Sequence, residues 1–535
     1  MCGAGVLFLL PSLLEQGLLK TSDVYSLPSK HYYGLESVVL TLSFMALGRI
    51  KNPEQLKQCK PGELGKIIGL DRIPEVRCLR NKIKLLTDQQ KATKLNNLLI
   101  DHWYAQNHQD ASFMYIDGHQ RIYYGHKANL PVKYISRQKL CLSATTEYWV
   151  NDATGMPVMM VMGQLTEKLQ TAIETYIIPQ MQQTNLLVSG SPPEQNIPQC
   201  TFIFDREAYE PAFFQKLWDT YRIAVITYRK NVKDSWDENS FNTTETKVLE
   251  QAVTMSICEQ QTELGGYTFR EIRRLSKGGH QTAIITTHPT LDIAEIAGRM
   301  FGRWIQENFF KYLIHDYDFD KMIQFGIEHI DPEQQVVNPQ YRKINNRLKK
   351  LREKKQRMEA KFYPLAQLVM EQHIEQIPAI IHKQAEYKEI LDKYQQQESE
   401  LINLRKQYPP KITLKQMPDQ TRYNKLKTES KLLINVIKMI CYRAESAVAS
   451  LIAPNLSREK EEKRMVVKQI IANNADLIPD YINKTLTVKL HSLSAPRFNL
   501  AAHQVAILLN QTQTIFPGTD LRMIFNTTAN SDCEG

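Results

Sequence analysis

"SFMYIDGHQRIYYGH", residues 112–126, is where the hydrophobic pattern of this 535-residue chain changes. Before it, apolar residues recur at helical spacing with Pro and Gly breaks between them, so residues 1–105 are expected to be helical. From residue 111 onward, short apolar runs end in turn residues, as "FMYI" does at Asp117 and Gly118. This change predicts that a helical N-terminal region gives way to a sheet.

The residues that follow predict a mixed sheet. "TTEYWVNDATGMPVMMVMG", residues 145–163, is typical of a β-hairpin. Apolar runs then alternate with helical patterns, at 165–183 (helix), 200–204 (strand), 211–221 (helix) and 222–231 (strand). The order β-β-β-α-β-α-β indicates the α/β class. Short strands at 232–287 then form an insertion.

Residues 338–408 are long, charged and helical in pattern, with heptad spacing. This predicts a helical hairpin or a coiled coil, broken near Pro364 and Pro378. Residues 342–361 contain ten Lys or Arg and only two Glu. Such a surface is either a solvated helix or one that follows phosphates.

Four regions are therefore expected. They are a helical N-terminal region at 1–105, an α/β core with its β insertion at 106–330, charged long helices at 331–410, and a small α+β region at 411–535.

Composition limits the class of protein. A hydrophobic content of 42% is enough for a sizeable core, and a formal charge of +10 favours a polyanionic partner such as nucleic acid. The eight cysteines form no CxxC pair, which argues against a zinc site and a disulfide framework and fits a reducing compartment. The apolar start lacks a basic segment, and residues 35–48 are too short to span a bilayer. We expect a soluble intracellular protein with no membrane role.

A second stretch, "GRMFGRWIQENFFKYL" at 298–313, predicts a helix with one charged stripe, Arg303, Glu307 and Lys311. The opposite stripe is apolar, and two glycines near it would let another backbone come close. The stripe is either a solvated ladder of charges or a functional face.

Three carboxylates are candidates for a metal site. Asp117 and Asp205 each end an apolar strand, the first and fourth of the sheet, which lie side by side in this layout. A later helix crossing that edge brings a third, Glu307. Converging carboxylates repel one another unless a cation neutralises them, and oxygen ligands suit Mg²⁺ or Mn²⁺. Two such ions about 4 Å apart can hold the attacking and leaving oxygens of a phosphoryl transfer.

The arrangement resembles the DDE transposases of bacterial insertion sequences, which have an RNase H-like core. It is most similar to the subgroup with a β-strand insertion before the Glu and a Tyr-Arg-Glu-Lys signature. "RWIQENFFKYL" supplies Arg303 and Glu307 at the signature spacing, and "FDREAY" and "ITYRKN" resemble the second-Asp motif and the basic strand after it. Met300 and Ile314 stand where the signature has Tyr and Lys. The likeness covers roughly residues 110–320.

The resemblance implies roles for individual residues. Asp117, Asp205 and Glu307 would bind two Mg²⁺ or Mn²⁺ ions and form the catalytic triad. The residues implied to contact DNA are Arg303, Lys311, Arg206, Arg229 and Lys230.

It also implies an activity and partners: cleavage at element ends, strand transfer to target DNA, and a homodimer on paired ends in a prokaryotic cytoplasm. The N-terminal helical region would recognise the end sequence, and residues 338–408 are a candidate dimer interface. No small-molecule substrate is expected.

Two alternatives remain open. A nuclease of the same fold would cut without strand transfer, and the triad alone does not separate it from a transposase. A DNA-binding protein descended from a transposase would have lost catalysis, which the residues at 300 and 314 motivate.

Overall fold

The structure is a computed structural model of the chain. It describes every residue except 29–31, 106–107, 126–127, 136–137, 164–166, 189–195, 249–250, 318–326, 329, 371–376, 419–421, 424, 453–458 and 529–535. No helix in the described ranges is long and apolar enough to cross a membrane. The chain forms two compact units: unit 1 contains residues 1–122, 145–326 and 426–535, and unit 2 contains residues 123–144 and 327–425.

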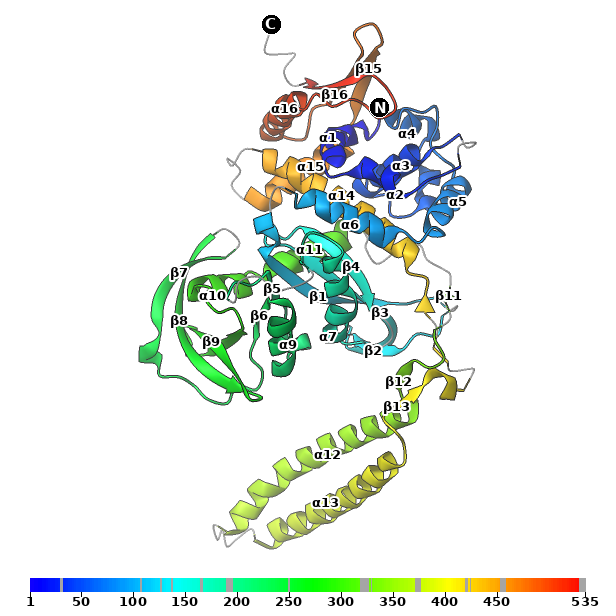
Figure 1. Cartoon of the computed structure of the whole chain (residues 1–535). Coiled ribbons are helices and arrows are strands. Elements are labelled where there is room, and N and C mark those ends of the chain that lie inside the picture. The colour runs from blue at the N-terminus through cyan, green and yellow to red at the C-terminus, as the bar shows by residue number, and fades with distance from the viewer. Residues whose placement is uncertain are drawn as a thin grey trace. The chain divides into compact units, whose positions relative to one another are not determined.

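Unit 1 begins with helices, as the apolar spacing predicts (Figure 1). They are α1 (Leu10–Glu15), α2 (Thr21–Val24), α3 (Leu35–Leu47), α4 (Pro61–Ile67), α5 (Val76–Thr87) and α6 (Ala92–Trp103).

The large mixed sheet of unit 1 confirms the α/β class. Within unit 1 its strands are ordered β3-β1-β5-β6-β10-β9-β8-β7, and β4 pairs with β3 beside this path. Their bounds are β1 (Phe113–Ile122), β3 (Leu140–Asn151), β4 (Pro157–Gly163), β5 (Cys200–Ile203), β6 (Ile223–Tyr228), β7 (Asn242–Val248), β8 (Gln251–Leu264), β9 (Tyr267–Leu275) and β10 (Gln281–Thr286). β1, β5 and β6 are parallel neighbours, and β3 with β4 is the predicted hairpin.

Helices connect the parallel strands, and the apolar side chains of these helices cover the sheet. α7 (Leu169–Ala172) and α8 (Ile178–Gln182) precede β5, and α9 (Pro211–Tyr221) lies between β5 and β6. Phe214 and Leu217 of α9 share a buried cluster with Val225 of β6. β5 is buried at every residue, as expected for a strand covered on both faces.

The insertion extends the sheet. β10 pairs antiparallel with β6, and β9, β8 and β7 continue outward from it as an antiparallel meander. Gly265 and Gly266, both with positive φ, make the turn between β8 and β9.

The stretch 298–313 is not one continuous helix. α10 (Ile293–Phe301) ends at Gly302, and α11 (Trp304–Asp316) begins after Arg303. A Cβ on Gly298 would lie 2.6 Å from the carbonyl oxygen of Lys247, which confirms that this glycine allows a close backbone approach, here by β7. The side chains of residues 304 and 305 lie outside what the structure describes.

Both ends of the chain share one hydrophobic core in unit 1. α14 (Glu429–Leu451) is buried along most of its length and packs against α1, α3, α6 and β4. The same core includes Phe8 near the N-terminus, Phe309 of α11 and Phe525 near the C-terminus. The remaining elements are α15 (Glu459–Ala472), β15 (Ala475–Asp480), β16 (Thr485–Leu490), α16 (Pro496–Gln511) and β17 (Arg522–Thr527).

Unit 2 contains a helical hairpin, as predicted. α12 (Pro339–Met370) continues past Pro364, contrary to the expected break there, and α13 (Ile377–Lys406) has Pro378 at its second position, where a helix tolerates it. Glu398 of α13 pairs with Arg352 at 2.7 Å and Lys355 at 3.2 Å. The short strands are β2 (Val132–Ile135), β11 (Ile327–Glu328), β12 (Gln335–Val337), β13 (Lys411–Thr413) and β14 (Lys425–Leu426).

Candidate functional site

Asp117 lies in β1, beyond the part of the strand that pairs with β5. The last register pair of that ladder is Tyr115 with Ile203, and β1 continues to Ile122. Asp117 is therefore inside its strand and does not end it, contrary to the sequence-based expectation. Its Oδ1 accepts a hydrogen bond from the backbone N–H of Gly118 at 2.9 Å.

Asp205 lies two residues beyond the same register pair, just after the neighbouring strand β5 ends at Ile203. Because both aspartates lie the same number of residues beyond one register pair, they are at the same level along the strand direction. Adjacent strands are about 4.8 Å apart, so the two backbones are close at this level. This confirms that the first and fourth predicted strands are neighbours. Asp205 Oδ1 accepts a hydrogen bond from the backbone N–H of Glu207 at 2.7 Å, and the Asp205 carbonyl accepts one from the Thr227 hydroxyl at 3.2 Å. The turn that follows Asp205 and the neighbouring strand β6 therefore hold Asp205 in place.

Gln306 fastens α11 to the sheet beside Asp117. Its buried amide nitrogen donates to the carbonyls of Tyr115 at 3.1 Å and Trp149 at 3.2 Å, and to Asn151 Oδ1 at 3.2 Å. These acceptors belong to β1 and β3. The next residue, Glu307, is exposed and lies at the start of the same helix.

Aromatic contacts fix the rest of α11. Phe309 packs on Trp149 with ring centres 5.6 Å apart, and Phe310 stacks on His119 at 5.7 Å. His119 is buried, which fits a packing role for this residue. The helix that carries Glu307 is thus held against the strand that carries Asp117.

The electrostatics join the three carboxylates. Burial raises the pKa of Asp117 to about 6; positive Arg303 opposes this rise, and negative Asp205 and Glu307 add to it. All three neighbours therefore lie within electrostatic range of Asp117. The carboxyl group keeps its proton to a higher pH than an exposed aspartate does.

These carboxylates fit a hard divalent cation in their chemistry. Carboxylate oxygens are the ligands that Mg²⁺ and Mn²⁺ prefer, and a cation among the three would remove the repulsion that contributes to the raised pKa of Asp117. In the described part of the chain, no three Asp, Glu, His or Cys side chains converge closely enough to hold a metal ion. The three carboxylates therefore match a metal site in residue type and in lying near one another, but their side chains do not converge on one point.

Arg303 lies in the break between α10 and α11. Its Nε is buried and has no hydrogen-bond partner within the described residues. Burial raises the pKa of Tyr228, while Arg303 and Arg206 oppose the rise, so these two cations lie near the end of β6. The Arg206 guanidinium is 5.8 Å from the centre of the Tyr228 ring.

The other residues implied to contact DNA have different surroundings. Arg229 forms an ion pair with buried Glu271 of β9, which also binds Arg273 at 2.7 Å, so Arg229 belongs to a charge network of the insertion. Lys230 lies 5.6 Å from the centre of the Tyr209 ring. Lys311 is exposed, one helical turn beyond Glu307.

Trp236 is partly buried and contacts side chains of the insertion. The Arg273 guanidinium lies 4.2 Å from the centre of its ring, and its backbone N–H donates to Gln281 at 2.9 Å.

Sequence reasoning missed Gln306, whose bonds fix α11. One signal was present: Gln306, Phe309, Phe310 and Leu313 follow helical spacing on one buried face. A polar residue on an otherwise apolar face needs buried partners.

Charged residues of α14 contact both the α11 region and the sheet. Glu445 is fully buried and accepts from the hydroxyls of Tyr312 (2.7 Å) and Tyr317 of the α11 region and from Arg49 at 2.6 Å. Arg443 donates to the carbonyl of Pro157 at 3.0 Å, where β4 begins.

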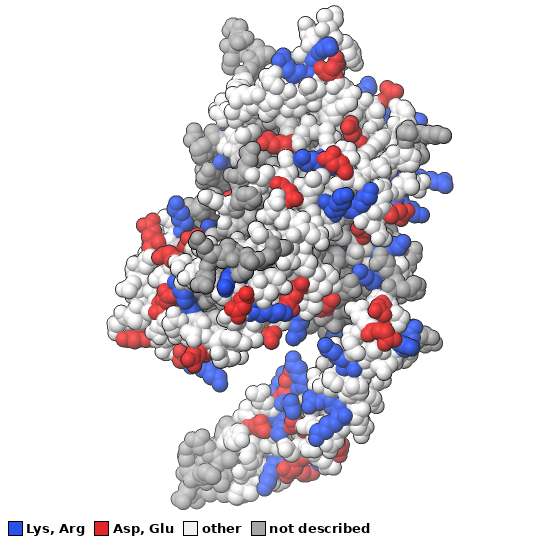
Figure 2. Space-filling model, viewed as in Figure 1, with Lys and Arg blue, Asp and Glu red and all other residues white. Residues whose placement is uncertain are grey.

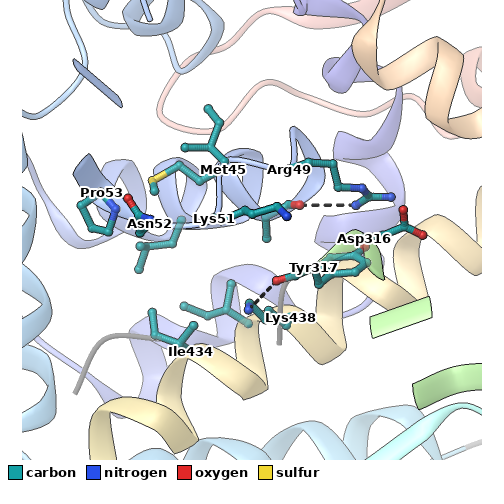
Figure 3. Close-up of a pocket in the computed structure, with 13 residues that line it drawn as sticks. Met45, Arg49, Lys51, Asn52, Pro53, Asp316, Tyr317, Ile434 and Lys438 are labelled. Carbon is teal, nitrogen blue, oxygen red and sulfur yellow. Dashed lines mark hydrogen bonds between the residues drawn. The ribbon is translucent and has the colours of Figure 1, made fainter. Parts of the chain in front are cut away.

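A pocket lies beside this network (Figure 3). Arg49, Lys51 and Lys438 line it together with Asp316 and Tyr317. Lys438 donates to the carbonyl of Tyr317 at 2.8 Å, and Asp316 pairs with Lys468 at 2.8 Å. These charges stabilise the end of α11.

Comparison with known proteins identifies a family. A family model described as "Transposase protein" matches residues 1–529. No curated protein and no solved structure matches the chain. The family match includes the N-terminal helices and unit 2 as well as the sheet.

Proposed function

Because the chain belongs to this family of transposase proteins, we propose that it cuts DNA at the ends of a mobile element and transfers those ends to target DNA through a DDE triad. The triad consists of Asp117, Asp205 and Glu307. The observation that carries the proposal is the placement of both aspartates two residues beyond one register pair of adjacent parallel strands.

The sheet order supports an RNase H-like core. A β4-β3-β1 meander is continued by parallel β5 and β6, with α9 between the last two strands. This is the layout that brings the first and fourth strands of such a core together. Along the chain, the antiparallel strands β7 to β10 lie between β6 and α10. The subgroup of DDE transposases that this chain resembles has its β-strand insertion at the same point.

The three carboxylates would hold two Mg²⁺ or Mn²⁺ ions. When bound, the ions lower the pKa of the attacking water or 3′-hydroxyl and stabilise the departing oxyanion. Asp205 would supply an oxygen oriented by the backbone N–H of Glu207, and Asp117 one held by Gly118. Glu307 would complete the set from the first turn of α11, which Gln306 fixes to β1.

Arg303 would bind a phosphate of the DNA next to the cleaved bond. Its buried Nε has no hydrogen-bond partner among the residues that the structure describes, which supports this role, since a buried donor is costly unless it is hydrogen-bonded. Arg206 at the same strand ends would contact the backbone further along. DNA is the partner that a transposase implies, and a homodimer on paired ends is part of the proposal.

The first test is cutting of a labelled duplex that carries the terminal repeat of the source element, with Mg²⁺ or Mn²⁺. We expect the parent to cut at the element end and to join it to a second duplex. Glu307→Gln should bind the duplex but lower the rate by at least about 10³-fold, because one metal ligand is lost. Glu295→Gln, the same change in α10, is the matched control and should keep the parent rate.

Two other outcomes select the alternatives. Cutting without joined products would identify a nuclease that does not transfer strands. Binding by the parent and by Glu307→Gln without cutting under either metal would identify a DNA-binding protein that has lost catalysis.

A further inference from the structure

The positive charge of the chain is concentrated in unit 2. This unit holds 23 of the 67 lysines and arginines but only 13 of the 57 aspartates and glutamates, so it carries the whole formal charge of +10. Unit 1 is neutral in the same count. Figure 2 shows Lys and Arg side chains gathered over the described part of the hairpin.

Within unit 2, the exposed cations of α12 form a regular stripe. They recur every four and three residues, at Lys343, Arg347, Lys350, Lys354, Arg357 and Lys361. Since a helix turns about 100° per residue, these positions stay within a band about 80° wide. We call this set the basic stripe.

The basic stripe is separate from the face that packs on α13. Ile344, Leu348 and Leu351 are buried against α13. Arg352 and Lys355 pair with Glu398 across the hairpin. By contrast, all six side chains of the stripe are exposed, and none forms an ion pair within the described residues.

We propose that the basic stripe binds the sugar–phosphate backbone of duplex DNA; this rests on the proposed function. It spans 19 residues, and its first and last positions are about 27 Å apart at about 1.5 Å of rise per residue. At about 3.4 Å per phosphate along one strand, this matches roughly eight base pairs. A regularly spaced row of cations suits a partner with regularly spaced negative charges.

The composition of the stripe favours nucleic acid over a protein. No aromatic or aliphatic side chain lies among the six cations, whereas a stable protein interface has an apolar centre. Nothing in the stripe reads base edges, so its binding is independent of sequence. The basic stripe of unit 2 thus binds DNA through residues other than those of the proposed triad, which belong to unit 1.

The salt dependence of binding tests this proposal. The affinity of the full chain for a labelled duplex of arbitrary sequence would be measured by fluorescence anisotropy from low to high salt. Each lost phosphate contact lowers the steepness of log K against log salt by about 0.9. The triple variant Lys343→Gln, Lys350→Gln and Lys354→Gln should therefore lower it by up to about 2.7.

The matched control is Lys383→Gln, Lys388→Gln and Lys406→Gln in α13, which removes the same charge from exposed positions that form no stripe, since Lys383 lies about 140° around the helix from Lys388 and Lys406. It should change the slope by less than about 1, as expected for fewer than two phosphate contacts. Glutamine and lysine have similar helix propensities, so both variants should keep the helical content of the parent.

Equal slopes for the two triple variants would overturn the proposal. An unchanged slope together with a smaller dimer fraction in sedimentation would also overturn it and assign the stripe to a protein contact. Cutting of the terminal repeat at low salt separates this result from the proposed function, because the stripe variant should still cut. Failure of the parent to cut would count against the catalytic proposal alone.

Discussion

At the scale of single residues, the carboxyl group of Asp117 makes the stability of unit 1 depend on pH. In the folded chain it keeps its proton up to a pH of about 6, because burial raises its pKa. In an unfolded chain it ionises near about 4. Ionised Asp117 therefore destabilises the fold, and this cost develops as the pH rises through about 4 to 6.

We expect Asp117→Asn to melt at a higher temperature than the parent at pH 8 without divalent cations. The gain should be on the order of 1–2 kcal/mol and should vanish at pH 4, where the parent carboxyl is protonated. Added Mn²⁺ should stabilise the parent and not the variant. Thermal unfolding followed by circular dichroism measures both effects.

Asp219→Asn on the exposed face of α9 is the control and should show no gain at either pH. If the parent and Asp117→Asn melt at the same temperature at pH 8, ionised Asp117 does not destabilise the fold.

Some of the site could be foreseen residue by residue, and some could not. Asp117 and Asp205 follow apolar runs of sequence, and the order of these runs in the chain predicts that the two aspartates are neighbours. The partner of Arg229 is Glu271, 42 residues further along the chain, in a strand of the insertion. No local pattern connects two such residues, so Arg229 looked like a free cation near the site.

At the scale of elements, the boundary between α10 and α11 depends on a tertiary contact that the hydrophobic periodicity of the sequence does not predict. Apolar spacing continues across residues 298–313, so the sequence predicts one helix. In the structure, α10 packs on β7 through Gly298, and the chain begins a new helix after Gly302 and Arg303. Tertiary packing decides the direction of the second helix, and this places Glu307.

Gly298→Ala should therefore destabilise the chain. The new Cβ would lie 2.6 Å from both the Lys247 carbonyl oxygen and the Thr246 hydroxyl, so β7 or α10 must shift. We expect a loss on the order of 2 kcal/mol in urea unfolding, as for overpacking in a core. Gly278→Ala is the control, because a Cβ there meets nothing within 4 Å. Equal midpoints for the two variants would refute the close approach.

At the scale of the whole molecule, the two units should differ in their importance for folding. The hairpin of unit 2 begins and ends at one place, since Asn338 donates to the carbonyls of Pro410 at 3.1 Å and Pro409 at 3.0 Å. Replacing residues 340–408 with a short Gly-Ser loop should leave a cooperative thermal transition within a few degrees of the parent.

The comparison is a chain that stops after Thr428 and so lacks α14. It should lose cooperative unfolding, because the core around α3, α6 and β4 loses its central helix. Near-ultraviolet circular dichroism during heating distinguishes the two results. A cooperative transition in the shortened chain would show that α14 is dispensable.

Composition predicts a polyanionic partner from the total charge but does not locate that charge. The basic run at 342–361 is visible in the sequence, but only the compact units show that unit 2 carries the whole formal charge. Likewise, no sequence pattern indicates that Phe8 and Phe525 touch, with ring centres 5.1 Å apart. Contacts between such distant segments depend on the whole fold.

The position of α14 has a consequence for the synthesis of the chain. The N-terminal helices are made first, but the helix that buries them lies beyond residue 428. At about 5–20 residues per second, translation takes roughly 20–90 s to reach it. During that time Leu7, Phe8 and Leu40 lack the C-terminal part of their core, so the nascent chain presents apolar surface to the chaperones of the cell.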